Sequence, residues 1–433
     1  MITVIDEMNA EVIAMLQAFY SRSHQPINDR LLEFGNDIDS IKNSMGKYYI
    51  NYGHESIADC GTITIFLEGV SLLAAKVFQD FPLYAGQESS TRYIDFSKQS
   101  WVEVNKQYNY LNQNLINFYL TSQAPLFEHL KTVYPGDMGD PKYVKTLKTK
   151  VFDILRGFLP GGMKTQLSWH TSLRQARARL IELSHHPLLE VRDICQSIIT
   201  NLLEKYPDSF TGIYESIEDK QEFYKKHSEE IYYLEIPDED LIDFNTDKIN
   251  YAKLGVESWT IGKINRRNNK DPIPRYLELL PDFLFEFQLD FASARDLLRH
   301  RRGYIPLPVL DTRLNFNKWY LDQLSYDLKN KAITLLDQNK NVLNNSSLSK
   351  YQTQYYLPIG YNVPILAKLS MQQIIYMIEL RSSKTVHPTL RAVIHKIAKI
   401  MEDKHKINKY CDIFCDYDDS FSMRRAEQDI VLK

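Results

Sequence analysis

The residues best suited to chemistry lie in the stretch 54–93 of this 433-residue chain. It opens with His54-Glu55-Ser56 and closes with Glu88-Ser89-Ser90-Thr91-Arg92-Tyr93. A short Glu-x-Ser-x-Arg loop such as residues 88–93 can surround an anion with backbone N–H groups and hydroxyls. Its guanidinium can bind phosphate through two hydrogen bonds and stays charged at any relevant pH. The stretch therefore predicts a site for an anion such as phosphate.

A second candidate is the basic triplet Arg299-His300-Arg301. Taken alone it is weak evidence, because basic residues at a helix end usually meet solvent or the C-terminal carbonyls. Its position within an internal repeat strengthens the functional interpretation.

That repeat is anchored by two dipeptides, Leu159-Pro160 and Leu357-Pro358. Each is followed by a Gly-containing loop, an amphipathic helix with Ile-Glu-Leu near its end, and a His-Pro that starts another helix. Apolar residues recur at helical spacing in both copies: Leu173, Ala176, Leu180 and Leu183 in one, and Met371, Ile374, Ile375 and Ile378 in the other. The histidines before these prolines are interpreted as structural.

A strand followed by a helix is expected upstream of each Leu-Pro. The first copy predicts a strand over 62–67 and a helix over 70–81, and the second predicts a strand over 283–290 and a helix over 291–302. The expected fold is α+β, with tandem modules at 1–225 and 226–433 that mimic a homodimer in one chain. The boundary is expected within the acid-rich segment 222–250.

These residues together resemble the flavin-dependent thymidylate synthases. The signature of that family runs Arg-His-Arg, two spacers, Ser, spacer, Asn or Gln, Glu, spacer, Ser, spacer, Arg-Tyr. The first copy keeps the second half, as Glu88, Ser90, Arg92 and Tyr93, but has Asp80-Phe81-Pro82 in place of Arg-His-Arg. The second copy keeps Arg299-His300-Arg301 and then continues as GYIPLPVLDTR.

The same complementary loss recurs downstream. The family places one Arg three residues before Leu-Pro and another at the end of the following helix. The first copy keeps the former as Arg156 and has Ser184 at the latter. The second copy has Gln354 at the former and keeps Arg381 at the latter. Each copy thus holds the half that the other lacks.

The resemblance implies sites built between the copies. Glu88, Ser90 and Arg92 would serve catalysis, and Arg92, Arg156 and Arg381 would bind the substrate phosphate. The flavin, FAD, would be bound by His54, Arg174, Arg299, His300 and Arg301. The reaction implied is transfer of a one-carbon unit from methylenetetrahydrofolate to dUMP, with a hydride from FAD that NADPH reduces. Two chains would form a homodimer, a pseudo-tetramer of modules.

Two alternatives stay open because no single copy carries a complete signature. The chain could be a non-catalytic paralogue that binds a nucleotide, or an enzyme of the same architecture with another pyrimidine nucleotide as substrate. Departures from the family pattern at Ala85, Gln87 and Ser172 motivate the non-catalytic alternative.

Composition argues against several other classes of protein, such as nucleic-acid-binding, secreted and membrane-spanning proteins. A net charge of −3 provides no general field for nucleic acid. The acidic N-terminus does not resemble a secretory signal, and no run of eighteen apolar residues predicts a membrane span. Four cysteines in so long a chain suggest a reducing compartment, by default the cytoplasm. Cys411 and Cys415 are interpreted as packing or surface thiols, and no metal is expected.

Overall fold

The structure is a computed structural model that describes residues 9–21, 27–29, 55–92, 94–232, 241–243, 267–273, 277–278, 281–405 and 411–420. Two compact units make up the chain. Unit 1 comprises Met1–Glu68, Val77–Glu88 and Gln166–Ile231, and unit 2 comprises Gly69–Lys76, Ser89–Thr165 and Tyr232–Lys433. The units interleave in sequence, and the modules 1–225 and 226–433 stay a prediction.

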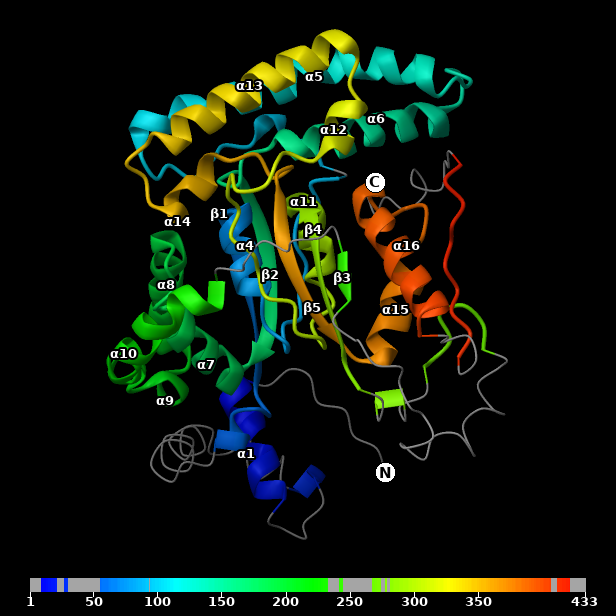
Figure 1. Cartoon of the computed structure of the whole chain (residues 1–433). Coiled ribbons are helices and arrows are strands. Elements are labelled where there is room, and N and C mark those ends of the chain that lie inside the picture. Colours follow the sequence, from blue (N-terminus) through cyan, green and yellow to red (C-terminus); the bar gives the residue numbers. More distant parts are fainter. Residues whose placement is uncertain are drawn as a thin grey trace. The chain divides into compact units, whose positions relative to one another are not determined.

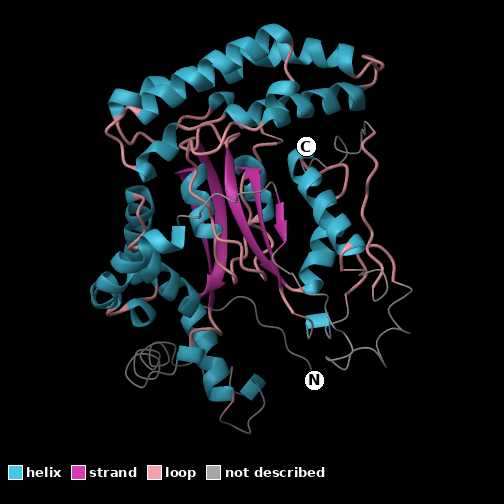
Figure 2. Ribbon diagram, viewed as in Figure 1, coloured by secondary structure: helices cyan, strands magenta, loops and turns pink. Residues whose placement is uncertain are grey.

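A two-stranded sheet pairs β1 (Thr62–Ser71) with β2 (Lys164–Ser172) (Figure 2). Alternate residues of β2 are buried, as expected for a strand that covers a core on one face. The helices of unit 1 are α1 (Ala10–Tyr20), α7 (Leu173–Leu183), α8 (Leu189–Lys205), α9 (Pro207–Phe210) and α10 (Ile213–Tyr232). Buried Glu11 joins α1 to α9 by accepting hydrogen bonds from the backbone N and Oγ of Ser209, at 2.9 and 2.5 Å.

Unit 2 contains an antiparallel sheet in the order β3 (Leu241–Asp243), β4 (Phe283–Asp290) and β5 (Asn362–Leu369). The register of β4 and β5 runs from Phe283 opposite Leu369 to Asp290 opposite Asn362. Every second residue of β4 from Phe283 is a buried Phe or Leu. The helices α11 (Phe291–Leu297), α15 (Met371–Arg381) and α16 (Pro388–Asp403) contact this sheet.

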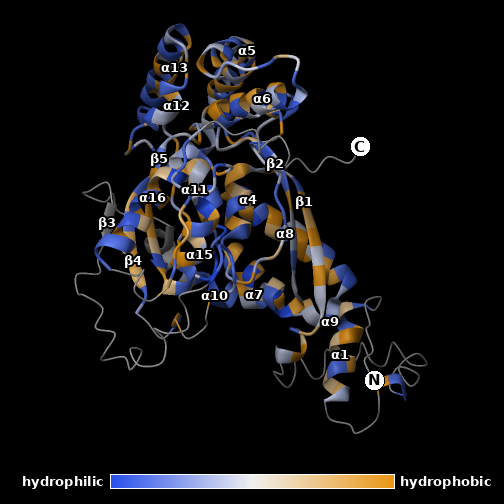
Figure 3. Cartoon of the chain, turned by 90° about the vertical axis from the view of Figure 1, so that its right-hand side faces the viewer, coloured by the Kyte–Doolittle hydropathy of each residue, from blue (hydrophilic) through white to orange (hydrophobic). Residues whose placement is uncertain are grey.

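A group of helices completes unit 2, with α5 (Asn109–Val133), α6 (Pro141–Leu155), α12 (Lys318–Asp322) and α13 (Tyr326–Asn344) gathered together (Figure 1). Hydrophilic and hydrophobic residues alternate along them, as amphipathic helices require (Figure 3). The remaining helices are α4 (Leu72–Gln79) and α14 (Lys350–Thr353), with 3₁₀ turns at Glu55–Ile57, Phe96–Lys98, Lys106–Tyr108, Arg156–Phe158 and Gln354–Tyr356.

The α+β class predicted from the sequence is confirmed, and so is the strand 283–290. The strand predicted over 62–67 continues to Ser71, so its helix begins at Leu72. The helix predicted to reach residue 302 ends at Leu297, and Arg299–Arg301 lie in the following turns. Strands β2 and β5 were missed. Their sequences, KTQLSWHTS and NVPILAKL, follow glycine loops and carry polar or proline residues that weaken a strand signal.

The two Leu-Pro loops of unit 2 pair with each other reciprocally. Gly161 N donates to Leu357 O at 2.8 Å, and Ile359 N donates to Leu159 O at 2.9 Å. A second such pair joins Gly162 N to Tyr355 O at 3.1 Å and Gly360 N to Gly157 O at 2.7 Å. Exchanging the two loops reproduces both pairs, which is the pattern of a local two-fold relationship.

Further contacts of unit 2 recur in the same paired way. Three backbone hydrogen bonds among residues before 200 each have a counterpart among residues after 290. The bond from Leu72 N to Met163 O matches that from Phe291 N to Tyr361 O, and the bond from Lys164 N to Ser100 O matches that from Asn362 N to Asn315 O. The bond from Val102 N to Gly162 O matches that from Asn317 N to Gly360 O. The starts of two helices match too: Ser71 Oγ accepts from Ala74 N at 3.0 Å, as Asp290 Oδ1 accepts from Ser293 N at 2.9 Å.

Candidate functional site

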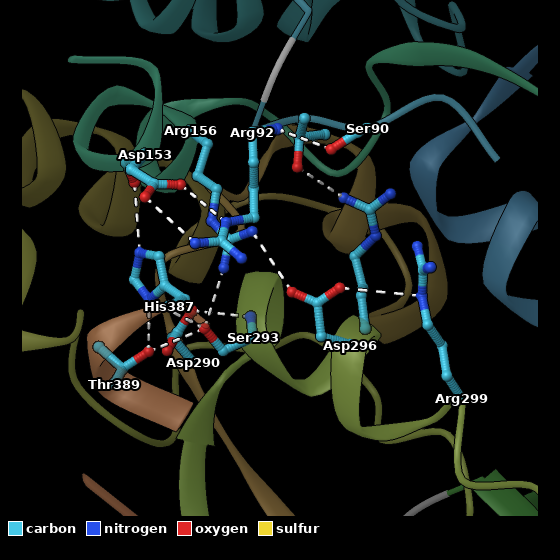
Figure 4. A network of polar contacts seen from close by, with 12 residues as sticks. Ser90, Arg92, Asp153, Arg156, Asp290, Ser293, Asp296, Arg299, His387 and Thr389 are labelled. Carbon is cyan, nitrogen blue, oxygen red and sulfur yellow. Dashed lines mark hydrogen bonds and ion pairs between the residues drawn. The ribbon is translucent and has the colours of Figure 1, made fainter. Parts of the chain in front are cut away.

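Arg92 ends the predicted anion loop and lies against the last turns of α6. Its Nε and Nη2 donate to the two carboxylate oxygens of Asp153, at 2.8 and 3.2 Å. Its backbone N donates to Ser90 Oγ at 3.3 Å, which stabilises a tight turn at the end of the loop. Arg92 is thus fixed in place by unit 2 (Figure 4).

Arg156, only 2% exposed, follows α6 directly and points toward the start of α11. Its Nη2 donates to Ser293 Oγ at 3.0 Å, and its Nη1 lies 3.7 Å from Asp296 Oδ2. Burial alone would lower the pKa of this guanidinium, but Tyr320, Asp296 and Asp290 reverse the effect and raise the pKa. Arg156 therefore stays charged inside the protein.

The carboxylate of Asp296 lies at the centre of several guanidiniums. Arg156 is on one side, and Arg299 Nε approaches Oδ1 at 3.8 Å on the other. Burial would raise the pKa of Asp296, but Arg156, Arg92, Arg299 and Arg381 together hold it well below its usual range. Asp296 is therefore an ionised carboxylate, and its Oδ2 has no hydrogen-bond donor among the described residues.

Arg381 ends α15 and reaches the same place from the other side. Its Nη2 donates to the backbone oxygen of Asp296, and its Nε donates to His300 Nε2, both at 2.9 Å. A histidine that accepts at Nε2 is neutral. Burial, helped by Arg381 and Arg301, lowers the pKa of His300 to about 3, in agreement with that protonation state.

Arg295 connects the loop with α11, since its Nη1 donates to the hydroxyl of buried Thr91 at 3.4 Å. We refer to Arg92, Arg156, Arg295, Arg299 and Arg381 as the arginine cluster. Among the described residues, three carboxylates are in contact with it: Asp153, Asp290 and Asp296. In that part of the chain the guanidiniums of the cluster outnumber these carboxylates, in a largely buried setting. Such an excess favours binding of an anion.

A buried polar network lies behind Arg156 (Figure 4). The Ser293 hydroxyl contacts Thr389 Oγ1 at 2.8 Å and His387 Nδ1 at 3.2 Å, and His387 Nε2 lies 3.3 Å from the backbone oxygen of Asp153. Burial lowers the pKa of His387 far below normal, so its ring is neutral. Its Nε2 then donates to Asp153 and its Nδ1 accepts from a hydroxyl. Tyr320 extends the network by donating to Asp290 Oδ1 at 2.7 Å.

Unit 2 therefore brings together Ser90, Arg92, Arg156, Arg299, His300 and Arg381, which the sequence had predicted from distant segments. Arg301, half-buried, follows His300 and lowers its pKa. Two predicted residues belong to unit 1. Glu88 accepts from Gln79 Nε2 at 2.9 Å, and Arg174 is paired with Asp59. His54 lies outside the described residues, as does Tyr93.

The acidic and hydroxyl partners of the cluster were missed from the sequence. Asp153, Asp290, Ser293, Asp296 and Thr389 belong to no recognisable motif. One signal was available: Asp290 and Ser293 have the spacing of a helix N-cap and its third residue.

Two further observations concern the described residues as a whole. No group of His, Cys, Asp or Glu among them has the arrangement of a metal site. None of the helices in the described ranges is long and apolar enough to cross a membrane.

The fold and the site define an α+β protein with a buried arginine cluster, assembled from both halves of its sequence. Residues 3–208 match the family model described as thymidylate synthase complementing protein. That range includes Ser90, Arg92 and Arg156. This match confirms, over residues 3–208, the resemblance to that family seen in the sequence.

Full-length relatives are similar across both halves of the chain. A UPF0159 protein of Chlamydia muridarum is 25% identical over 86% of this chain and 80% of its own length. A UPF0159 protein of Chlamydia pneumoniae is 23% identical over 94% of this chain and 87% of its own length. A UPF0159 protein of Thermoplasma acidophilum is 20% identical over 90% of this chain and 92% of its own length. The similarity therefore extends beyond residue 208.

Proposed function

We propose that this protein is a flavin-dependent enzyme that methylates a pyrimidine nucleoside monophosphate, as in dUMP to dTMP. Methylenetetrahydrofolate would supply the carbon and NADPH the electrons. The modules 1–225 and 226–433 would be tandem copies that form one composite site, and two chains would assemble as a homodimer. The family match and the paired Leu-Pro loops support this proposal.

The observation that carries it is the meeting of Ser90–Arg92 with Arg299 and Arg381 around Asp296. A phosphate group on the substrate would accept from guanidiniums of the cluster, offsetting its excess charge. Arg156 would contribute to this binding in a fixed orientation, because Ser293 and Asp296 hold its guanidinium. A positioned phosphate orients the rest of the nucleotide for reaction.

Arg299 fits a role toward FAD better than His300 does. The Arg299 side chain is 42% exposed, and the ion pair that it forms with Asp296 among the described residues is long at 3.8 Å. It can therefore offer hydrogen bonds to an anionic group of the cofactor. The His300 ring instead accepts from Arg381, so its role is to orient that arginine. When bound, FAD would supply the hydride.

The direct test is the colour and activity of the purified protein. A yellow protein with the two absorption bands of oxidised flavin, able to rescue a thymidine auxotroph, is the expected result. Replacing both Arg299 and Arg301 with Ala should remove the flavin. Retention of stoichiometric flavin by that double variant would contradict the composite site.

A second candidate, a paralogue that binds a nucleotide without this reaction or acts on another pyrimidine nucleotide, is favoured by one contact. Asp296 places a carboxylate among the arginines expected to bind the substrate. A colourless protein that binds nucleotide and takes up no added flavin would support the non-catalytic form. A flavin-loaded protein that fails to rescue the auxotroph would support the altered substrate.

A further inference from the structure

The paired contacts of unit 2 define a position that matches the arginine cluster. Arg156 and Gln354 each stand three residues before a Leu-Pro, open a 3₁₀ turn and are at most 5% exposed. The reciprocal bonds between their loops make the two residues equivalent. The residues around Gln354 therefore show which side chains occupy the position in the second copy that matches the arginine cluster.

Gln354 makes no contact like that of Arg156 with Ser293. The residue that matches Ser293 in α4 is Ala74, because each is the third residue of a helix whose N-cap side chain accepts its backbone N–H. Ala74 has no hydroxyl to offer. Gln354 instead turns toward its own half of the chain: its Oε1 accepts from Leu310 N at 3.0 Å, and its Nε2 donates to Tyr351 O at 3.3 Å.

The segment 305–310 (Ile-Pro-Leu-Pro-Val-Leu) stands where the second copy would carry its anion loop. It directly follows Tyr304, which bridges Lys368 in unit 2 as Ala85 bridges His170 in unit 1. All six residues are buried. Pro306 and Pro308 have no backbone N–H, and none of the six side chains can donate a hydrogen bond to an anion.

This segment is packed against the first copy. A Cβ atom built on Gly161 would lie 3.2 Å from Cδ2 of Leu73 and 3.3 Å from Cδ2 of Leu310, so both leucine side chains lie close to Gly161 and leave little room beside it. Lys76 stands in the place of Arg295 and is buried with interaction partners of its own. The matched position therefore holds apolar side chains, one amide bound to backbone, and one buried ammonium, Lys76, that is engaged with partners of its own.

We infer that the chain binds one anionic ligand, at the arginine cluster, and that residues 305–310 close the matched position as an apolar plug. The inference rests on the proposed function only for the identity of the ligand. It differs from a symmetric pair of modules, in which two equivalent sites would bind two ligands.

Titration calorimetry of the full chain with dUMP, and separately with inorganic phosphate, tests this inference. One equivalent per chain is expected. Two equivalents, or no binding of either probe, would overturn it. If phosphate binds at one equivalent and dUMP does not bind, the single site stands and the proposed function fails.

Two variants test whether the one bound ligand lies at the arginine cluster. Arg156→Gln places the residue of the plugged position into the cluster and should weaken binding about ten- to hundredfold. Gln354→Met should leave both stoichiometry and affinity unchanged. Arg92→Gln provides a second test of the cluster if Arg156→Gln does not fold. An unaltered equivalent in both arginine variants, or loss of binding in Gln354→Met, would contradict the assignment.

The plug is tested by Leu310→Ala. Thermal unfolding should occur at a lower temperature, because the side chain is fully buried, while the stoichiometry should stay at one. A gain of a second equivalent in this variant would show that the matched position retains binding capacity and would count against the inference.

Discussion

Arg156 and Ser293 are 137 positions apart in sequence and are joined by a buried hydrogen bond of 3.0 Å. The bond connects the end of α6 with the first turn of α11, and it sets the direction of a guanidinium that has little freedom to move. Three other polar groups, from Thr389, His387 and Asp290, complete the surroundings of Ser293.

Ser293→Ala should impair both ligand binding and folding. The substitution removes the acceptor of Arg156 Nη2, so the guanidinium becomes less well oriented. We expect a loss of about 1–3 kcal/mol in stability and about tenfold in affinity for phosphate or nucleotide. Urea denaturation and calorimetry measure the two effects. Ser197→Ala, which removes an exposed hydroxyl on α8, should change neither quantity.

Asp296→Asn should make the protein more dependent on an added anion. Its removal leaves Arg156 and Arg299 without their carboxylate, which we expect to cost about 1–3 kcal/mol in phosphate-free buffer. Added phosphate should raise the melting temperature of this variant more than that of the wild type. Asp311→Asn, which breaks the Arg313 pair, is the matched control and should respond to phosphate as the wild type does. An equal response of Asp296→Asn would contradict the role of Asp296.

Tyr320→Phe should destabilise the fold through Asp290. Asp290 is fully buried, and its Oδ2 has no hydrogen-bond donor in the part of the chain that the structure describes. Among the described residues, loss of the Tyr320 hydroxyl would leave Oδ1 with the Ser293 N–H as its donor, at an expected cost of about 1–3 kcal/mol. Urea denaturation provides the measurement. Tyr326→Phe, at a position 80% exposed, should be neutral.

Stability should decrease in mild acid because of His300. Its pKa is about 3 in the folded protein, against about 6.5 in an unfolded chain. At pH values between these two, the His300 ring is protonated in the unfolded chain and neutral in the folded protein. The contribution of His300 to the free energy of unfolding is therefore fully present above about pH 6.5 and is lost as the pH falls toward 3. At pH 5 the loss from this residue is about 2 kcal/mol.

His300→Gln removes the titrating group while keeping an acceptor for Arg381. The difference in unfolding free energy between pH 7 and pH 5 should then shrink by that amount. It should not vanish, because burial also lowers the pKa of His387 and of His186. An unchanged pH dependence would mean that His300 is not held neutral in solution.

The sequence predicted the meeting of distant segments better than the contacts inside the site. Complementary losses at Asp80–Pro82 and Gln354 indicated that Arg92 and Arg156 should face the second half, and the structure brings these residues together with Arg299 and Arg381. The carboxylates could not be predicted, since an Asp near an Arg acquires meaning only from distance and burial.

Short matching sequences aligned the helices of the two copies less reliably than the positions of their N-cap residues did. The repeated Ile-Glu-Leu aligned Arg381 with Ser184. Ser172 and Ser370 are the N-caps of α7 and α15, and each accepts from the backbone N three residues later. Counted from these caps, the partner of Arg381 is the buried Leu183. A local hydrogen bond thus gives a register that short sequence identities do not.

The paired Leu-Pro loops have a consequence for how this molecule can diversify. In a dimer of identical chains, every substitution occurs on both sides of the two-fold axis, so a change that plugs one cavity plugs its mate. Here the two sides are encoded separately. One side can therefore lose its polar residues and pack with apolar side chains while the other side retains its polar residues.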